Sequence, residues 1–366
     1  MTLSLLGLNR EDLQQLFIQW GEKPFRAAQV MKWIYHVGLR DYHMMTDISK
    51  VLRQRLADET NMDLPQVVAD HPSRDGSRKW LLRLEDGNSI EMVFIPESDR
   101  GTLCISSQVG CTLACSFCST ARQGFNRNLT TAEMIGQILL AAHLLGIPKN
   151  QGDRVITNVV LMGMGEPLLN FAAVVKAVAI MLDDYAFGIS KRRVTISSAG
   201  VVPAIEQLKQ VTDVSLAISL HATTDLLRDQ LVPLNQKYPI AELLRACQFY
   251  ADAKAGKKQI TFEYVMLDGV NDSDADARRL VKLMRTVPSK VNLIPFNPFP
   301  ESGYQTSPKA RVEHFREILM QAGVITVIRK TRGDDIAAAC GQLVGEVVDR
   351  TRRSHKLLSI MGEAVA

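Results

Sequence analysis

The chain has 366 residues, of which 46% are hydrophobic and 22% are charged, and this composition excludes a disordered or fibrous protein. The length exceeds what one compact core usually holds, so we expect one large domain and one smaller one. The net charge of +4 permits an acidic partner such as nucleic acid but does not require one.

The sequence carries no sign of export or membrane insertion. Residues 1–17 lack a basic start, a long apolar core and a small-residue cleavage site. The most apolar run, 134–147, is interrupted by Gln137 and His143 and is too short to span a bilayer. We therefore expect a cytoplasmic protein without a membrane partner. In that compartment, clustered cysteines more often bind metal or do chemistry than form structural disulfides.

Residues 8 to about 63 show helical spacing, with apolar residues at three- and four-residue intervals, and no strand is expected there. Residues 1–70 are predicted to form a helical accessory domain of an RNA-binding type. Two strand-like runs flank Asp86–Gly87 and predict a β-hairpin within an extension at 71–101. Glu91 lies in the second run, where a glutamate is commonly on the wet face of an alternating strand.

Beyond residue 102, short apolar strands alternate with amphipathic helices in six units, followed by one more apolar run at 324–330. This alternation predicts parallel strands covered by helices. We expect an α/β fold, a partial (β/α)6 barrel over 102–330, and then a C-terminal loop and helix at 331–366. An open doubly wound sheet is the alternative that periodicity leaves open. Thr130 and Glu133 have the spacing of a capping box at the start of the first helix.

Cys111, Cys115 and Cys118 have C-x3-C-x2-C spacing on the loop that leaves the first of these strands. Three thiolates can hold three irons of a [4Fe–4S] cluster and leave the fourth iron open to another ligand. A structural zinc site needs a fourth ligand nearby, and the next histidine, His143, lies inside a predicted helix. A chance group of buried thiols fits such close spacing poorly. The pattern favours an iron–sulfur cluster.

The segment CTLACSFC resembles the cluster motif of the radical S-adenosylmethionine (SAM) superfamily, and GMGEPLLN resembles its Gly-Glu-Pro segment. Glycine lets the backbone approach a ligand, and a carboxylate can pair with the SAM ammonium group. Ligands of both candidate folds collect at the C-terminal ends of the strands. The resemblance implies SAM contacts from residues at these ends: Gly165, Glu166, Ser197, Ser219, Leu220, His221 and Asn297. For His221, a structural hydrogen bond near a strand end is the other interpretation, and SSAG at Ser197 departs from the STSG of relatives.

Three cysteines lie outside this motif. Cys247 has an apolar position in a predicted helix and is expected to be a buried, inert thiol. Cys340 follows the last strand near the expected barrel mouth, where a short Ala-rich helix is the alternative. Cys104 lies on the first strand and is also placed near that mouth.

Four segments together resemble the RNA adenine-C2 methyltransferases of the RlmN family over nearly the whole chain: CISSQVGCTLACSFCSTARQGF, LMGMGEPLLN, LIPFNPFP and TRGDDIAAACGQL. The resemblance implies methylation of C2 of an adenine in the peptidyl-transferase region of 23S rRNA and of the adenine 3′ of the anticodon in tRNAs. It also implies a monomer served by a flavodoxin-like electron donor. Basic segments at 190–194 and 349–356 could hold phosphates, although basic ends are common without such a partner.

The same resemblance implies a radical mechanism with one [4Fe–4S] cluster and two SAM molecules per turnover, because electron-poor C2 does not attack SAM as a thiolate does. Cys340 first takes a methyl group by displacement, and this methyl group, activated as a radical, adds to C2. A base then removes the C2 proton, for which Glu91 is the candidate. Cys104 attacks the Cys340 sulfur and releases the product, which leaves a transient disulfide.

Two other interpretations stay open. An enzyme of the same scaffold methylates C8 of the same rRNA adenine and confers antibiotic resistance, and the cysteine arrangement suits both reactions. A non-enzymatic iron–sulfur sensor that binds RNA would account for the cysteine loop and the basic segments, but not for Cys340 or the strand-end SAM motifs.

Overall fold

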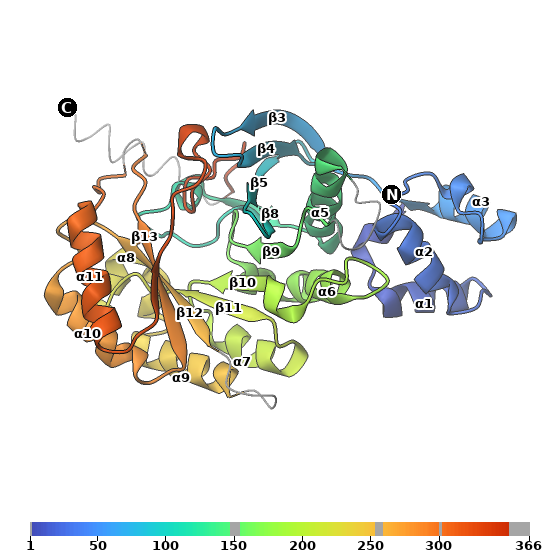
Figure 1. The fold of residues 1–366 in the computed structure, drawn as a ribbon. Helices are drawn as coiled ribbons and strands as arrows, with labels where there is room; N and C mark the ends of the chain where they lie inside the picture. Colours follow the sequence, from blue (N-terminus) through green and yellow to red (C-terminus); the bar gives the residue numbers. More distant parts are fainter. Residues whose placement is uncertain (1, 147–153, 253–258, 300–301, 351–366) are drawn as a thin grey trace.

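The computed structural model describes residues 2–146, 154–252, 259–299 and 302–350. Figure 1 shows one large sheet with helices along its outer face and a small group of helices beside the N-terminal end of the chain. Within the described part, no helix combines the length and the apolar character needed to cross a lipid bilayer.

The N-terminal module is built from the helices α1 (Arg10–Gln19), α2 (Arg26–Tyr35) and α3 (Lys50–Glu59). Helix α1 begins with a capping box, in which the Asn9 side chain accepts from Asp12 N and Asp12 accepts from Asn9 N. A short parallel pair, β1 (Leu3–Ser4) and β2 (Thr60–Asn61), joins the two ends of the module. The expectation that residues 8 to about 63 hold no strand is wrong because β2 lies among them. A strand of two residues leaves no periodic pattern.

The main sheet of the described residues has ten strands in the order β14-β13-β12-β11-β10-β9-β6-β5-β4-β3. Their bounds are β3 Gln66–Pro72, β4 Arg78–Arg83, β5 Ser89–Pro96, β6 Gly101–Cys104, β9 Asn158–Leu161, β10 Val194–Ser198, β11 Ser215–Ser219, β12 Ile260–Met266, β13 Ser289–Pro295 and β14 Thr326–Ile328. From β6 to β14 each neighbour pairs in parallel, in chain order and without reversal. A doubly wound sheet reverses at a switch point, so that alternative is excluded. The sheet is not closed, and the expected partial barrel is confirmed.

Helices follow the parallel strands and cover their outer face, as Figure 1 shows. Their bounds are α5 Thr131–Leu145, α6 Phe171–Leu182, α7 Val202–Val211, α8 Asp225–Leu231, α9 Ile240–Ala251, α10 Asp274–Met284 and α11 Lys309–Gln321. The capping box predicted for Thr130 and Glu133 is present at the start of α5 and is confirmed.

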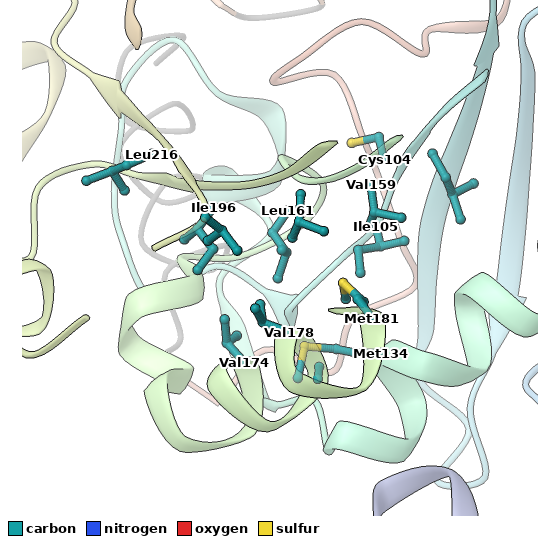
Figure 2. Close-up of a cluster of buried hydrophobic side chains, with 14 of the residues drawn as sticks. Cys104, Ile105, Met134, Val159, Leu161, Val174, Val178, Met181, Ile196 and Leu216 are labelled. Atoms are coloured by element: carbon teal, nitrogen blue, oxygen red, sulfur yellow. The ribbon is translucent and has the colours of Figure 1, made fainter. Parts of the chain in front are cut away.

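Figure 2 shows the core between helices α5 and α6 and the first parallel strands. Met134 of α5, Val178 of α6 and Leu161 of β9 belong to this cluster, and all three are fully or almost fully buried. Burial of this apolar surface is the main favourable term that holds the helices on the sheet. The sheet edge where the strands end is thereby fixed, and the loops beyond it are held in place.

An antiparallel extension precedes the barrel. The predicted hairpin around Asp86–Gly87 is confirmed as β4 paired with β5, but a further strand, β3, pairs with β4. Strand β3 begins at Gln66, inside the range expected for the helical module. Its sequence ends in Asp70, His71 and Pro72, which strands seldom contain, and most of its side chains are exposed at the sheet edge. The division of the chain into four regions stays a prediction.

Residues 329–350, which we call the strap, follow β14 and carry Cys340. Their regular structure is one short 3-10 helix, η7 (Asp334–Ile336), so the alternative of an Ala-rich helix at Cys340 is wrong. Figure 1 shows the strap rising from the far end of the sheet towards β3 and β4. Residues 351–366, with most of the basic segment 349–356, lie outside the described residues.

Candidate active site

The three motif cysteines lie on a loop closed by a small antiparallel pair, β7 (Gln108–Gly110) and β8 (Phe125–Asn128). Cys111 N donates to Gly124 O at 2.8 Å, and Cys118 N donates to Cys115 O at 3.2 Å. Cys118 directly precedes the short helix α4 (Ser119–Arg122). A backbone hydrogen bond therefore closes the base of the loop, and a second one closes a turn at Cys115–Cys118.

This loop and the strand ends enclose one pocket with about 1050 Å³ of space free of protein atoms, part of it open to solvent. Ten of the predicted site residues line it: Cys111, Cys115, Cys118, Gly165, Glu166, Ser197, Ser219, His221, Asn297 and Cys340. Leu220 does not line the pocket; its side chain is fully buried in the hydrophobic core. Side chains alternate at a strand end, so Leu220 points away from the face that Ser219 and His221 share.

Gly165 and Glu166 follow β9 and meet the cysteine loop. Gly165 has φ of 101°, and a Cβ atom there would lie 2.4 Å from the Gln108 side chain. Gln108 Oε1 accepts from Glu166 N at 3.0 Å and from Thr112 N at 3.2 Å. One glutamine thus joins the Gly-Glu-Pro segment to the cysteine loop, although nothing in its local sequence marked it.

The Glu166 carboxylate is buried and already bound by the backbone. It accepts from Ala199 N at 2.7 Å and from Leu168 N at 3.0 Å. Burial raises the pKa of Glu166 to about 7, although these hydrogen bonds oppose the shift. Glu166 therefore holds two strand-end loops together and also lines the pocket.

His221 follows β11 in the left-handed region, with φ of 59°. Its Nδ1 accepts from Val265 N at 3.0 Å, so the neutral ring carries its proton on Nε2. Burial, with nearby Arg228 adding to it, lowers the pKa of His221 to about 3. The structural hydrogen bond considered for His221 exists, and the same ring also faces the pocket against Phe117, with the ring centroids 4.6 Å apart.

Arg228 of helix α8 was missed by sequence reasoning. Its side chain is fully buried and donates to Leu220 O at 3.0 Å, Ser219 O at 3.0 Å and Ala199 O at 2.6 Å. Five fixed donors allow one arginine to bind several carbonyl groups. Arg228 thereby ties together the ends of β10 and β11, from which the predicted SAM contacts arise.

Cys340 enters the pocket from the strap. Arg329 Nη1 donates to Cys340 Sγ at 3.3 Å and lies 3.8 Å from Glu263 Oε2. Burial, and then the charge of the Cys340 thiolate, raise the pKa of Cys104 to about 12; Cys104 itself does not line the pocket. All six cysteines are free thiols in this structure, and a Cys104–Cys340 disulfide is not present. Cys247 is fully buried, as expected.

Comparison with known proteins identifies the family. Residues 3–62 match the family described as ribosomal RNA large subunit methyltransferase N-terminal domain, and residues 105–281 match the radical SAM superfamily. A radical SAM methyltransferase from Sphaerobacter thermophilus is 41% identical, with a TM-score of 0.86 over 93% of this chain and 99% of that one. The chain belongs to the RlmN-type radical SAM methyltransferases.

Two solved structures resemble this RlmN-type enzyme more weakly, and the assignment does not depend on them. A domain of a pyruvate-formate lyase-activating enzyme from Bacteroides vulgatus is 17% identical, with a TM-score of 0.36 over 47% of this chain and 99% of that one. A structure of TYW1 with a lysine-pyruvate adduct is 14% identical, with a TM-score of 0.44 over 75% of this chain and 90% of that one.

Membership of the radical SAM superfamily implies a [4Fe–4S] cluster and SAM, and the pocket of this RlmN-type enzyme fits them. Three thiols on one loop face a space that is also lined by polar strand-end residues. Among the described residues, no three His, Cys, Asp or Glu side chains are placed to hold a single metal ion. In a cubic cluster each thiolate binds a different iron, so this spacing suits a cluster better than zinc. Glu263 Oε2 is buried on the pocket wall, 3.8 Å from Arg329 Nη1, and accepts no hydrogen bond from a described residue.

Glu91 is not on the wet face of its strand. Its side chain is only 4% exposed, its carboxylate lies 3.0 Å from Lys79 Nζ, and it accepts from Val344 N at 2.8 Å. Burial raises the pKa of Glu91, although Lys79 opposes the shift. The expectation of exposure failed because the strap, distant in sequence, covers this face. Glu91 does not line the pocket in the RlmN-type structure.

Proposed function

We propose that this RlmN-type methyltransferase methylates C2 of an adenine in 23S rRNA and of the adenine 3′ of the anticodon in tRNAs, with Cys340 as the methyl carrier. The observation that carries the proposal is the position of Cys340, which shares one pocket with Cys111, Cys115 and Cys118. A [4Fe–4S] cluster with SAM would supply the carbon radical that functionalises an electron-poor ring position.

Cys340 is suited to carry the methyl group because its thiol is exposed to the pocket and oriented by Arg329. As a thiolate it can displace the methyl group from SAM, which forms a carbon–sulfur bond and releases S-adenosylhomocysteine. Arg329 donates to the sulfur without reacting, so it sets the direction from which the sulfur attacks.

In this proposal, Cys104 releases the product. As a thiolate, its sulfur attacks the Cys340 sulfur and a sulfur–sulfur bond forms. The bond from Cys340 to the methylene carbon breaks with its electron pair on the carbon, which takes up a proton and becomes the methyl group. The resulting transient disulfide is then reduced by an external thiol. Cys104 is buried and its pKa is raised, so the thiol must lose its proton before it can attack.

Support for an RNA substrate comes from the N-terminal match to a ribosomal RNA methyltransferase domain at residues 3–62. The target base must leave its stack to reach a pocket of this kind. Lys191, Arg192 and Arg193 form an exposed basic turn before β10, in which Lys191 pairs with Asp213 at 2.9 Å. Basic side chains of this kind bind phosphate groups. Action in the cytoplasm as a monomer with a flavodoxin-like donor belongs to the same proposal.

The test is anaerobic incubation of cluster-loaded enzyme with methyl-labelled SAM, reductant and an rRNA fragment or tRNA, followed by mass spectrometry of the nucleosides. The proposal expects 2-methyladenosine. Detection of 8-methyladenosine would favour the related C8 reaction, and cleavage of SAM with unlabelled RNA would reject the RNA substrate.

A further inference from the structure

The strap is held almost entirely by other parts of the chain. On one side, Gly341 O accepts from Ser119 N at 2.7 Å, and Leu343 O accepts from Thr120 Oγ1 at 2.7 Å. On the other side, the antiparallel extension contacts the strap, for example through Ser89 N to Glu346 O at 2.9 Å. Because the strap has little regular structure of its own, these contacts decide where Cys340 lies.

Two buried charges of the extension bind the strap on both sides of Cys340. Lys79 of β4 donates to Ala337 O at 3.3 Å, three residues before Cys340. Glu91 of β5 accepts from Val344 N at 2.8 Å, four residues after it. The two side chains lie 3.0 Å apart, with side chains only 10% and 5% exposed. The pair therefore spans the segment that carries the reactive cysteine.

A gain in folding stability is a weak explanation for burying Lys79 and Glu91 as an ion pair. Removing two charges from water costs several kcal/mol, and an apolar pair of similar size is often as stable. Hydrogen bonds to charged groups are strong and directional, which suits them to fix a loop in one position.

We propose that Lys79 and Glu91 form a brace that positions the Cys340 segment against the cysteine loop, so that both are positioning residues. A role for Glu91 as proton acceptor requires a carboxylate that faces the substrate. Glu91 instead uses one oxygen for Lys79 and the other for Val344, away from the pocket wall. What Cys340 does once positioned rests on the proposed function.

The first test is hydrogen–deuterium exchange of the full chain, without any requirement for activity. Lys79→Met should speed exchange in peptides covering residues 337–346 by about tenfold, the loss expected for one hydrogen bond to a charged group. Since Lys79→Met leaves Glu91 unpaired and can destabilise the fold, Lys79→Met with Glu91→Gln is the second variant. Arg78→Met is the matched control, because Arg78 is the neighbouring residue and pairs with Asp70, away from the strap. Exchange at the wild-type rate in the double variant would overturn the brace.

The second test distinguishes a positioning role of Glu91 from a role as proton acceptor. With SAM and no RNA, the double variant should methylate Cys340 about tenfold more slowly than wild type, at an unchanged KM for SAM. Lys79→Arg, which keeps the positive charge, should methylate Cys340 faster than the double variant. If Glu91 is instead the base, Glu91→Gln methylates Cys340 at the wild-type rate and accumulates a covalent RNA adduct, which overturns the proposal. If wild-type Cys340 is never methylated, the proposed function fails, and the exchange experiment still decides the brace.

Discussion

Arg329 donates a hydrogen bond to the Cys340 sulfur at 3.3 Å, and the same guanidinium lies 3.8 Å from Glu263. Replacing Arg329 with Met should slow methylation of Cys340 by about tenfold, because a hydrogen bond with a charged donor orients the sulfur. The measurement is the rate at which the Cys340 peptide gains a methyl group, followed by mass spectrometry.

Arg316→Met is the control for this change, since Arg316 forms a partly exposed pair with Glu313 on α11. Equal rates for Arg329→Met and wild type would show that the arginine does not orient the nucleophile.

Cys340→Ala should abolish turnover while the visible absorbance of the cluster is retained, because Cys340 is not among the three motif thiols. Cys111→Ala should lose that absorbance, since it removes one of three ligands. Cys247→Ala should keep both RNA methylation and cluster absorbance, because this thiol is fully buried in the core. The comparison uses anaerobic absorbance spectra and RNA methylation of the three variants. Loss of the cluster in Cys340→Ala would place Cys340 among the ligands.

Cys104→Ala should accumulate RNA covalently attached to Cys340, because the resolving thiol is missing while the earlier steps remain. Denaturing gels of the variant after incubation with labelled RNA provide the measurement. Cys104→Ala with Cys340→Ala is the control and should show free RNA only. Free RNA in the Cys104 single variant would contradict the resolving role.

Much of the fold was predictable because it depends on local periodicity. The parallel strands and covering helices follow from short apolar runs alternating with amphipathic ones, and the cysteine loop from three cysteines within one segment. Strand β3 was missed because it lies at a sheet edge, where most of its side chains are exposed, and because Asp70 and Pro72 are residues that strands seldom contain. Its hydrogen-bond partners are backbone groups of β4, which comes later in the chain.

The site residues that escaped prediction act through contacts distant in sequence. Lys79 donates to Ala337 O in the strap. Glu91 was predicted on a solvent-exposed face, whereas the strap covers that face through Val344. Arg228 and Gln108 join loops that follow different strands, and the local sequence around them does not predict such contacts. Motifs revealed the residues that carry the chemistry, whereas those that hold the loops in place required the tertiary structure.

Gly165→Ala should destabilise the enzyme by about 1–3 kcal/mol more than Gly269→Ala, because of backbone strain and overpacking. Both glycines have positive φ, but a Cβ atom at Gly165 would meet Gln108 at 2.4 Å, whereas none of the described atoms lies within 4 Å of one at Gly269. Chemical denaturation of both variants measures the difference. Equal stabilities would show that Gln108 moves aside at little cost.

The last prediction concerns pH. Burial holds the pKa of His221 at about 3, below the ordinary value of 6.5, so the unfolded chain takes up a proton below pH 6.5 while the folded chain does not. The contribution of His221 to stability is thus present above pH 6.5 and is lost as the pH falls towards 3. Between pH 7 and pH 5 the free energy of unfolding should fall by about 2 kcal/mol from this group alone.

His221→Asn is the matched variant for this measurement, because asparagine tolerates positive φ and its side-chain oxygen can accept from Val265 N. Urea titrations of wild type and variant at pH 7, 6 and 5 give the difference in unfolding free energy at each pH. That difference should narrow steadily as the solution becomes more acidic, since only the wild type has an imidazole that the unfolded state protonates. A constant difference across this range would mean that His221 has the same pKa in the folded and the unfolded chain, and that its Nδ1 therefore does not keep the bond from Val265 N as the pH falls.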